Sequence, residues 1–234
     1  MKILSRSFRR AFTLVELLVV IALIGLLSAG LGLALTGDGN RSAALQNGQS
    51  TINSLLSGAR GQAALGQTEA AIFINVTLPT AATGIPEGFL REFRIARKVG
   101  TNWVVTGDGV LLPKGTAFVP PSGTAGVTFL PNLGDWTSTS APRTSNAFST
   151  SNTSLRLTAT GSNLTGDFRL VKAFNPRGTV NNSFSSGSRI VIAPVDVNAT
   201  GSGLEFKNPD FVRGARISNY GVAETINEAA GFEN

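Results

Sequence analysis

Residues 9–35 of this chain read RRAFTLVELLVVIALIGLLSAGLGLAL. Two arginines and a small residue precede a run of 24 residues, 12–35, in which Glu16 is the only charged side chain. At about 1.5 Å per residue, a helix of this length reaches about 36 Å, which is enough to cross a bilayer. The segment therefore predicts a membrane-spanning helix over residues 12–35.

The single carboxylate in this run needs an explanation. An acidic side chain at the centre of a membrane helix costs about 2.5–3.5 kcal/mol or more, so we expect Glu16 to have a partner of opposite charge. The apolar run contains no basic side chain. The nearest candidate is the α-amino group that would form if the chain were cut between Ala11 and Phe12.

This order of residues resembles the class III signal of type IV prepilins and type II secretion pseudopilins. The matching features are the small Ala11, Phe12 as the new N-terminus, Glu16, and the apolar residues that continue to Gly25. The family usually has glycine where this chain has Ala11, and alanine is also small enough for a tight peptidase subsite. The resemblance implies cleavage between Ala11 and Phe12 by a prepilin peptidase, N-methylation of Phe12, and roles for Glu16 and Gly25 in assembly.

Three other interpretations of the N-terminus compete with this one. A Sec signal peptide has a shorter apolar core of about 7–15 residues that ends in an A-x-A-like site, which residues 12–35 lack. A plain single-pass anchor explains the length of the run but not Glu16. A buried helix of a soluble domain explains neither the length nor the basic leader.

Composition excludes several classes of chemistry. The chain has 234 residues and a net charge of +6, but four of its basic side chains (Lys2, Arg6, Arg9, Arg10) precede the predicted cleavage site. Their removal leaves 16 basic and 14 acidic side chains, a charge of +2. There is no cysteine and no histidine, so disulfides, thiolate metal sites and histidine-dependent triads are excluded. The leader charges follow the positive-inside rule and predict a cytoplasmic N-terminus.

A second helical pattern follows the polar break at residues 36–40. Its apolar positions recur at spacings of three, four and seven, which place them on one face of a helix, and Gly66 is a suitable C′ residue. We therefore expect an amphipathic helix over residues 36–66 whose apolar face packs on a sheet. The residues of this stripe are Leu45, Ile52, Leu56, Ala59 and Ala63.

Residues 67–234 read as a series of short strands between glycine and proline breaks. Residues 132–152 are rich in Ser, Thr, Asn and Gly and predict a loop. One helix followed by many short antiparallel strands indicates an α+β domain, that is, a long N-terminal helix packed on an antiparallel sheet. The predicted strands are 69–77, 90–99, 104–105, 110–112, 116–119, 127–130, 154–158, 167–173, 189–193, 204–206 and 215–218.

The later part of the chain resembles the H-type minor pseudopilins. The segments that carry this resemblance are the helix-to-strand passage at residues 57–76, Trp103 with the turn at 111–115, and the strand-turn units at 174–178 and 214–221. The resemblance implies a pilin-like fold. Together with the N-terminal signal it divides the chain into a leader (1–11), a membrane helix (12–35), an amphipathic helix (36–66) and a β-rich globular domain (67–234).

The charged residues do not form a recognisable catalytic constellation, and we predict neither an enzyme nor a cofactor. Three loop aspartates could bind calcium, but the chain has no D-x-[DN]-x-[DN]-G run, so no metal site is predicted. Four basic residues cluster in the second predicted strand and are best interpreted as a solvated edge. The carboxylates considered are Glu87, Glu92, Glu224, Glu228, Asp108, Asp135 and Asp210, and the basic residues are Arg91, Arg94, Arg97 and Lys98.

Three functional hypotheses remain. The first is a minor pilin or pseudopilin in the bacterial inner membrane, single-pass, with its C-terminal domain in the periplasm and incorporated in a pilus or pseudopilus. The resemblance implies as partners other pilins through the N-terminal helix, a prepilin peptidase and an inner-membrane assembly platform. The second is a membrane-anchored binding or adhesin module that does not polymerise. The third is a DNA-receptor minor pilin, which the small mature charge does not favour.

We expect processing between Ala11 and Phe12 because the small residue, the phenylalanine and the buried glutamate occur in the order of the class III signal. Intact-mass or N-terminal analysis of the membrane-extracted protein should show a chain that starts at Phe12. A mature N-terminus at Met1, or one beyond residue 28, contradicts this prediction.

Overall fold

The structure is a computed structural model that describes residues 14–35, 38–79, 84–184 and 187–232, with side chains described for residues 14–27 and from residue 40 onward. The chain divides into two compact units, Met1–Asn40 and Arg41–Asn234. The leader predicted at residues 1–11 lies outside the described residues. The first unit contains helix α1 (Leu14–Leu35), and helix α2 (Asp38–Gly66) continues into the second unit.

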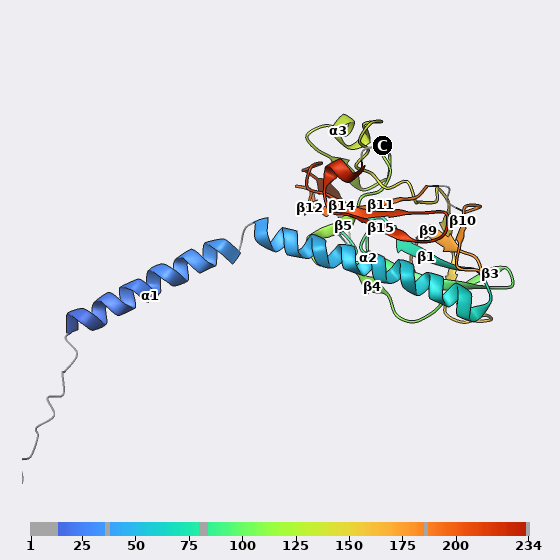
Figure 1. The fold of residues 1–234 in the computed structure, drawn as a ribbon, viewed down its shortest axis with the longest axis horizontal. Coiled ribbons are helices and arrows are strands. Elements are labelled where there is room, and N and C mark those ends of the chain that lie inside the picture. Colours follow the sequence, from blue (N-terminus) through green and yellow to red (C-terminus); the bar gives the residue numbers. More distant parts are fainter. Residues whose placement is uncertain (1–13, 36–37, 80–83, 185–186, 233–234) are drawn as a thin grey trace, which may run out of the picture. The chain divides into compact units, whose positions relative to one another are not determined.

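The second unit is β-rich (Figure 1). Its largest sheet has the order β10 (Val180–Asn181), β9 (Phe168–Phe174), β1 (Ala70–Asn75), β2 (Glu92–Val99), β3 (Asn102–Val105) and β8 (Leu155–Arg156), with β4 (Val110–Leu111) beside β2 and β7 (Asn152–Thr153) beside β9. A four-stranded sheet has the order β15 (Ala223–Ile226), β14 (Arg213–Ile217), β11 (Arg189–Pro194) and β5 (Thr116–Phe118). A small sheet contains β12 (Asp196–Val197), β13 (Leu204–Phe206) and β6 (Val127–Phe129), and a 3₁₀ turn covers Ala229–Phe232.

This arrangement confirms the predicted α+β class, with one correction. Most strand pairs are antiparallel, as in the long β1–β2 and β1–β9 ladders. Two pairs are parallel, β13 with β6 and β3 with β8. The strands of each parallel pair are far apart in the sequence, so no hairpin turn signals their pairing. Strands β7, β10, β12 and β15, which are two to four residues long, were not predicted.

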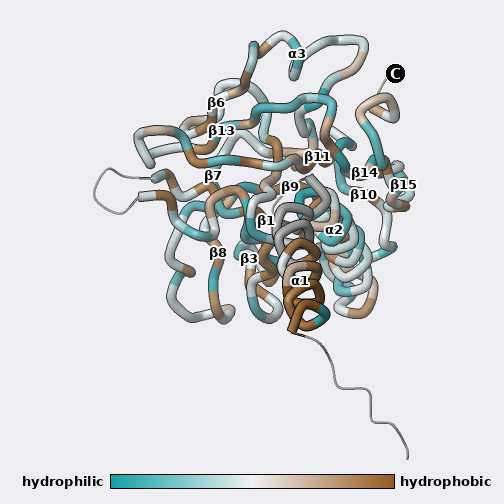
Figure 2. Tube along the Cα trace, turned by 90° about the vertical axis from the view of Figure 1, so that its left-hand side faces the viewer, coloured by the Kyte–Doolittle hydropathy of each residue, from teal (hydrophilic) through white to brown (hydrophobic). Residues whose placement is uncertain are grey.

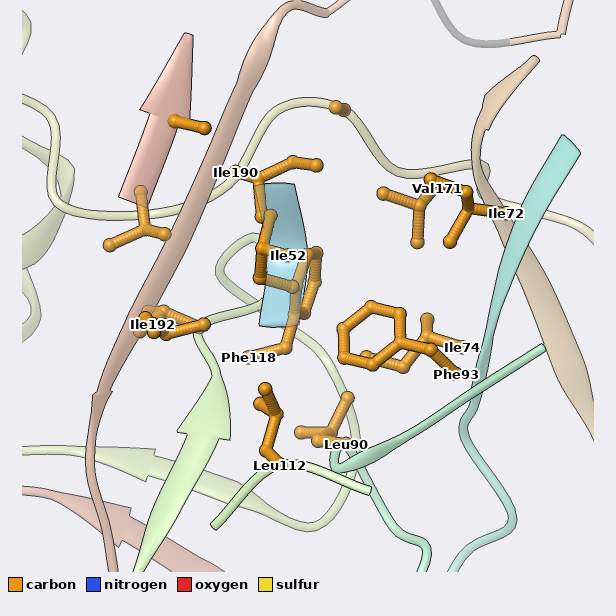
Figure 3. Packing of buried hydrophobic residues seen from close by; sticks show 14 of the residues in the cluster. Ile52, Ile72, Ile74, Leu90, Phe93, Leu112, Phe118, Val171, Ile190 and Ile192 are labelled. Atoms are coloured by element: carbon orange, nitrogen blue, oxygen red, sulfur yellow. The ribbon is translucent and has the colours of Figure 1, made fainter. Parts of the chain in front are cut away.

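The apolar stripe of α2 is buried as predicted. Leu45, Ile52, Leu56, Ala59 and Ala63 are each at most 2% exposed. Figure 3 shows Ile52 of α2 among Ile190 and Ile192 of β11, Phe118 of β5, and Phe93 and Ile74 of β2 and β1. The main hydrophobic core therefore lies where α2 meets the two larger sheets.

The end of α2 differs from the prediction by one residue. The residue in the left-handed conformation is Gln67, with φ of 48°, and not Gly66, which is still helical. The amide of Thr68 donates to the carbonyl of Ala63 over 3.3 Å, which is the Schellman hydrogen bond with Gln67 at C′.

Residues 132–152 are less irregular than a plain loop. A short helix, α3 (Leu133–Thr137), begins after Asn132, whose side chain accepts a hydrogen bond from the amide of Asp135. Trp136 of this helix is fully buried, and its Nε1 donates to the carbonyl of Leu130 over 2.9 Å. Its ring also contacts the rings of Phe129 and Phe206. The tryptophan therefore fastens this polar segment to the small sheet, which the composition alone did not show.

Strand β1 is buried on both faces. Ile72 and Ile74 join the main core, whereas Ala71 and Phe73 join a second cluster that includes Trp103, Leu155 and Phe168. A strand between two apolar layers reads as a continuous apolar run, which explains the sequence AAIFIN.

A buried lysine lies in β9 beside β1. Lys172 is 1% exposed, and its Nζ donates to Oδ1 of Asn182 over 3.0 Å and to the carbonyl of Gly187 over 2.6 Å. Burial lowers its pKa from 10.5 to about 8, because an ammonium group is poorly solvated there. The sequence analysis did not single out this residue.

We expect Leu56→Asp to unfold a fragment of residues 41–234, because an unpaired buried charge costs several kcal/mol and a domain of this size has a stability of about 5–15 kcal/mol. Thermal or urea melts followed by circular dichroism provide the measurement. Ser54→Asp on the exposed face of α2 is the matched control and should melt like the parent. If Leu56→Asp and the parent have the same melting midpoint, the apolar stripe of α2 is not part of the core.

We also expect Lys172 to make the free energy of unfolding pH-dependent. Its folded pKa, about 8, lies below the unfolded value, so the unfolded chain binds more protons between about pH 8 and 10.5, and stability from this group rises with pH in that window. Urea midpoints at several pH values should therefore rise with pH more steeply for the parent than for Lys172→Met. Lys114→Met, at an exposed lysine, is the control and should keep the parent slope.

Candidate functional site

The candidate site is helix α1 and the residues just before it. Leu14–Leu35 is apolar around its whole circumference, and Figure 2 shows it brown along most of its described length. In the first unit every side chain from residue 14 to residue 27 is exposed, from 45% at Val20 to 79% at Leu14 among the large apolar ones. A helix that is apolar all round needs an apolar environment, which is supplied by lipid or by other helices.

Helix α2 has the opposite character. Its apolar residues lie on one side, and Figure 2 shows it mostly white and teal. The two helices therefore suit different surroundings. Helix α1 can make apolar contacts on every side, whereas α2 makes apolar contacts with the sheets on one side.

Among the residues that the structure describes, no helix is both long enough and apolar enough to cross a membrane. The predicted span of residues 12–35 stays a prediction.

Glu16 lies in the first turn of α1. An acidic side chain at this end of a helix interacts favourably with the helix dipole and with the first amide groups. Ala11 and Phe12, the predicted cleavage site, lie outside the described residues, so the separation of Glu16 from the new amino group is not described. Gly25 lies in the middle of α1, and a Cβ atom at this position would meet nothing within 4 Å. Packing within this unit therefore does not require glycine at position 25.

The carboxylates considered from the sequence serve structural roles or stand apart. Glu92 accepts hydrogen bonds from Asn75 Nδ2 over 3.0 Å and from Arg94 Nε over 2.7 Å. Asp135 accepts a hydrogen bond at Oδ2 from Nδ2 of Asn132, the N-cap residue of α3, over 2.7 Å, and Asp210 forms an ion pair with Arg143 over 3.7 Å. Within the described part of the chain, no three acidic side chains come together in a way that could hold a metal ion.

Most of the basic residues in and just before β2 have hydrogen-bond or ion-pair partners. Arg94 pairs with Glu92, and Lys98 Nζ donates to Glu69 Oε2 over 2.7 Å. Arg91 donates to the carbonyl of Leu112 over 2.7 Å, which leaves Arg97 exposed. This arrangement fits a structural role and gives no support to a DNA-binding patch.

Comparison with known proteins gives one family match and one structural relative. Residues 6–32 match the family model described as the prokaryotic N-terminal methylation motif. No curated protein matches the chain. The fold is similar to that of the minor pseudopilin EpsH from the type 2 secretion system of Vibrio cholerae, at 10% identity and a TM-score of 0.39, over 78% of this chain and 95% of that protein.

The family match covers the residues on which the prediction from sequence was based, including Ala11, Phe12, Glu16 and Gly25. The assigned roles of these four residues stay predictions. The chain carries a prokaryotic N-terminal methylation motif, as its resemblance to the prepilins and pseudopilins predicts.

Proposed function

We propose that this protein is a minor pilin or pseudopilin, a structural subunit of a type II secretion pseudopilus or a type IV pilus rather than an enzyme. The observation that carries the proposal is the methylation motif at residues 6–32 with a carboxylate, Glu16, in the first turn of a helix that is otherwise apolar all round. The β-rich unit and its amphipathic helix α2 support the proposal, because they form a folded domain that follows this segment in the sequence.

In this proposal the precursor lies in the inner membrane with its basic leader in the cytoplasm and its globular unit in the periplasm. A prepilin peptidase cuts between Ala11 and Phe12 and methylates the amino group of Phe12. The mature subunit then leaves the membrane through an assembly platform and joins a bundle of similar apolar helices. The exposed apolar side chains of α1, residues 14–27, supply the contact surface of that bundle.

Glu16 gives the bundle its register. In a bundle of apolar helices an ammonium group and a carboxylate are both costly, and pairing them reduces the cost of each. At 4 Å and an effective dielectric constant of 20, two unit charges attract by about 4 kcal/mol. The amino group of Phe12, from the same subunit or a neighbour, is the partner that this proposal assigns to Glu16.

Gly25 has a different role in this proposal. Glycine in a helix interior is less favourable than alanine by about 1 kcal/mol, so Gly25 makes α1 easier to stretch or partly unwind during assembly. A Cβ atom at Gly25 would have no neighbour within 4 Å in the single subunit. This agrees with a need for glycine at this position that arises only in the bundle.

We expect Glu16→Gln to leave cleavage and the fold of the globular unit intact but to reduce assembly at least about tenfold, because loss of about 1.4 kcal/mol already changes an equilibrium by that factor. The measurement is the fraction of subunit in sheared or purified filaments, with mass analysis of the N-terminus in parallel. Val20→Leu, an apolar exchange in the same helix, is the control.

Two outcomes contradict parts of this proposal. Normal assembly of Glu16→Gln would rule out the charge pairing. A chain that is cleaved but never enters a filament, even with the sibling subunits present, would favour the anchored binding module instead.

A further inference from the structure

A groove of about 680 Å³ lies on the globular unit where the second half of α2 faces two turns. From α2 it is lined by Asn53, Arg60 and Gly61, and from the turns by Arg177 and Val222. All of these residues belong to the unit Arg41–Asn234, so the groove does not depend on where α1 lies.

The two turns that form one wall of the groove are held together by backbone contacts. The amide of Val180 donates to the carbonyl of Asn219 over 3.1 Å, which ties the turn after β9 to the turn before β15. At Gly221, with φ of 76°, a Cβ would lie 2.6 Å from the carbonyl oxygen of Gly178. The two turns therefore approach more closely than any residue but glycine allows.

Two positive charges in the groove have no counter-charge. Arg60 and Arg177 are both exposed, and neither guanidinium makes a hydrogen bond or ion pair with any residue that the structure describes. The lining contains no acidic side chain. By contrast, Arg94 and Lys98 on β2 are both paired with glutamates. Guanidinium groups bind carboxylates in bidentate geometry, so this pair of arginines suits an acidic ligand.

Asn53 is a half-buried polar residue of the groove lining. Its Nδ2 donates to Oγ1 of Thr225 over 3.1 Å, while its buried Oδ1 has no hydrogen-bond partner. If the two amide atoms are exchanged, the hydroxyl of Thr225 can donate to the oxygen and the nitrogen is left over, so one amide atom is unsatisfied either way. The unsatisfied atom is itself buried, so it takes no part in the ligand contacts proposed below.

Two exposed side chains lie in the turn between β14 and β15. Tyr220 is 75% exposed, and Val222, which lines the groove, is 55% exposed. Exposed tyrosine and arginine side chains are enriched at the sites that dominate protein–protein binding. With two cations in its lining, the groove is less suited to a nucleic acid, which needs many phosphate contacts.

We propose that this groove binds an extended acidic segment of a partner protein. Carboxylates of the segment pair with Arg60 and Arg177, and an apolar side chain packs on Val222. This site is separate from the proposed filament contacts of α1, so it does not rest on the proposed function.

The test uses the full chain in nonionic detergent and a fluorescent heptapeptide of alternating glutamate and valine, with a lysine–valine peptide as the matched probe. Fluorescence polarisation should show binding of the acidic peptide at or below about 1 mM at low salt, weaker binding at high salt, and no binding of the basic peptide.

Two pairs of variants locate the binding. Gly61→Trp should fill the groove and weaken binding at least about tenfold, whereas Gly61→Ala should bind like the parent, since a Cβ at Gly61 meets nothing within 4 Å. Arg60→Glu with Arg177→Glu should abolish binding of the acidic peptide and permit binding of the basic one. Arg97→Glu, at an exposed arginine of β2, is the charge control and should change neither.

Three results would overturn the proposal. The first is the absence of acidic-peptide binding up to about 1 mM. The second is equal binding by the Gly61→Trp and Gly61→Ala proteins, or equal loss in Arg97→Glu, either of which would indicate non-specific charge attraction. The third is tighter binding of a labelled oligothymidylate that Gly61→Trp also blocks, which would assign the groove to a nucleic acid. Thermal melts of each variant confirm that it is folded.

Discussion

The close approach of α2 to the sheets is the constraint on which the globular unit depends. A Cβ at Gly48 would lie 3.0 Å from Cδ1 of Ile192, and a Cβ at Gly58 would lie 3.3 Å from Cδ1 of Ile95. Ile192 belongs to the four-stranded sheet and Ile95 to the largest one, so a single helix face spans both. Between these contacts, buried Gln49 donates from Nε2 to the carbonyls of Gly214 and Ile226 over 2.8 and 2.6 Å. The helix therefore makes side-chain hydrogen bonds to the backbone of both β14 and β15, in addition to its apolar contacts with the sheets.

The features that the sequence predicts well are those with a local period. The α2 stripe at Ile52 and Leu56 follows the helical repeat, and the AAIFIN run of β1 is long and apolar enough to be recognised as a strand. The features it misses depend on distant partners. Gln49 looks like a surface residue of a helix until the carbonyl of Ile226 lies beside it. Lys172 interrupts an apolar strand, and only the fold shows the acceptors on Asn182 and Gly187.

The same distinction separates the two proposed functional surfaces. The N-terminal signal is contiguous, so the order of Ala11, Phe12 and Glu16 can be recognised without any knowledge of the fold. The groove combines Asn53 and Arg60 with Arg177 and Val222, which are more than a hundred residues away along the chain. No sequence motif or periodicity predicts that such distant positions lie close together in the fold. What marks them is that two exposed arginines, without ion-pair partners among the described residues, line the same groove, and this is visible only in the fold.

The distribution of charge agrees with the proposed function, in which the apolar segment and the globular unit occupy different environments. Much of the formal positive charge lies in the predicted leader, and Glu16 is the only charged residue in α1. In the globular unit most basic groups are used internally: Arg143 donates to the carbonyls of Pro209 and Ala141, and Arg189 donates to the carbonyl of Thr144. In the proposals above, the apolar segment determines whether the subunit assembles, and exposed groups of the globular unit determine what it recognises. The two sets of residues belong to different compact units, so we expect a change in one set to leave the stability of the other unit unaffected.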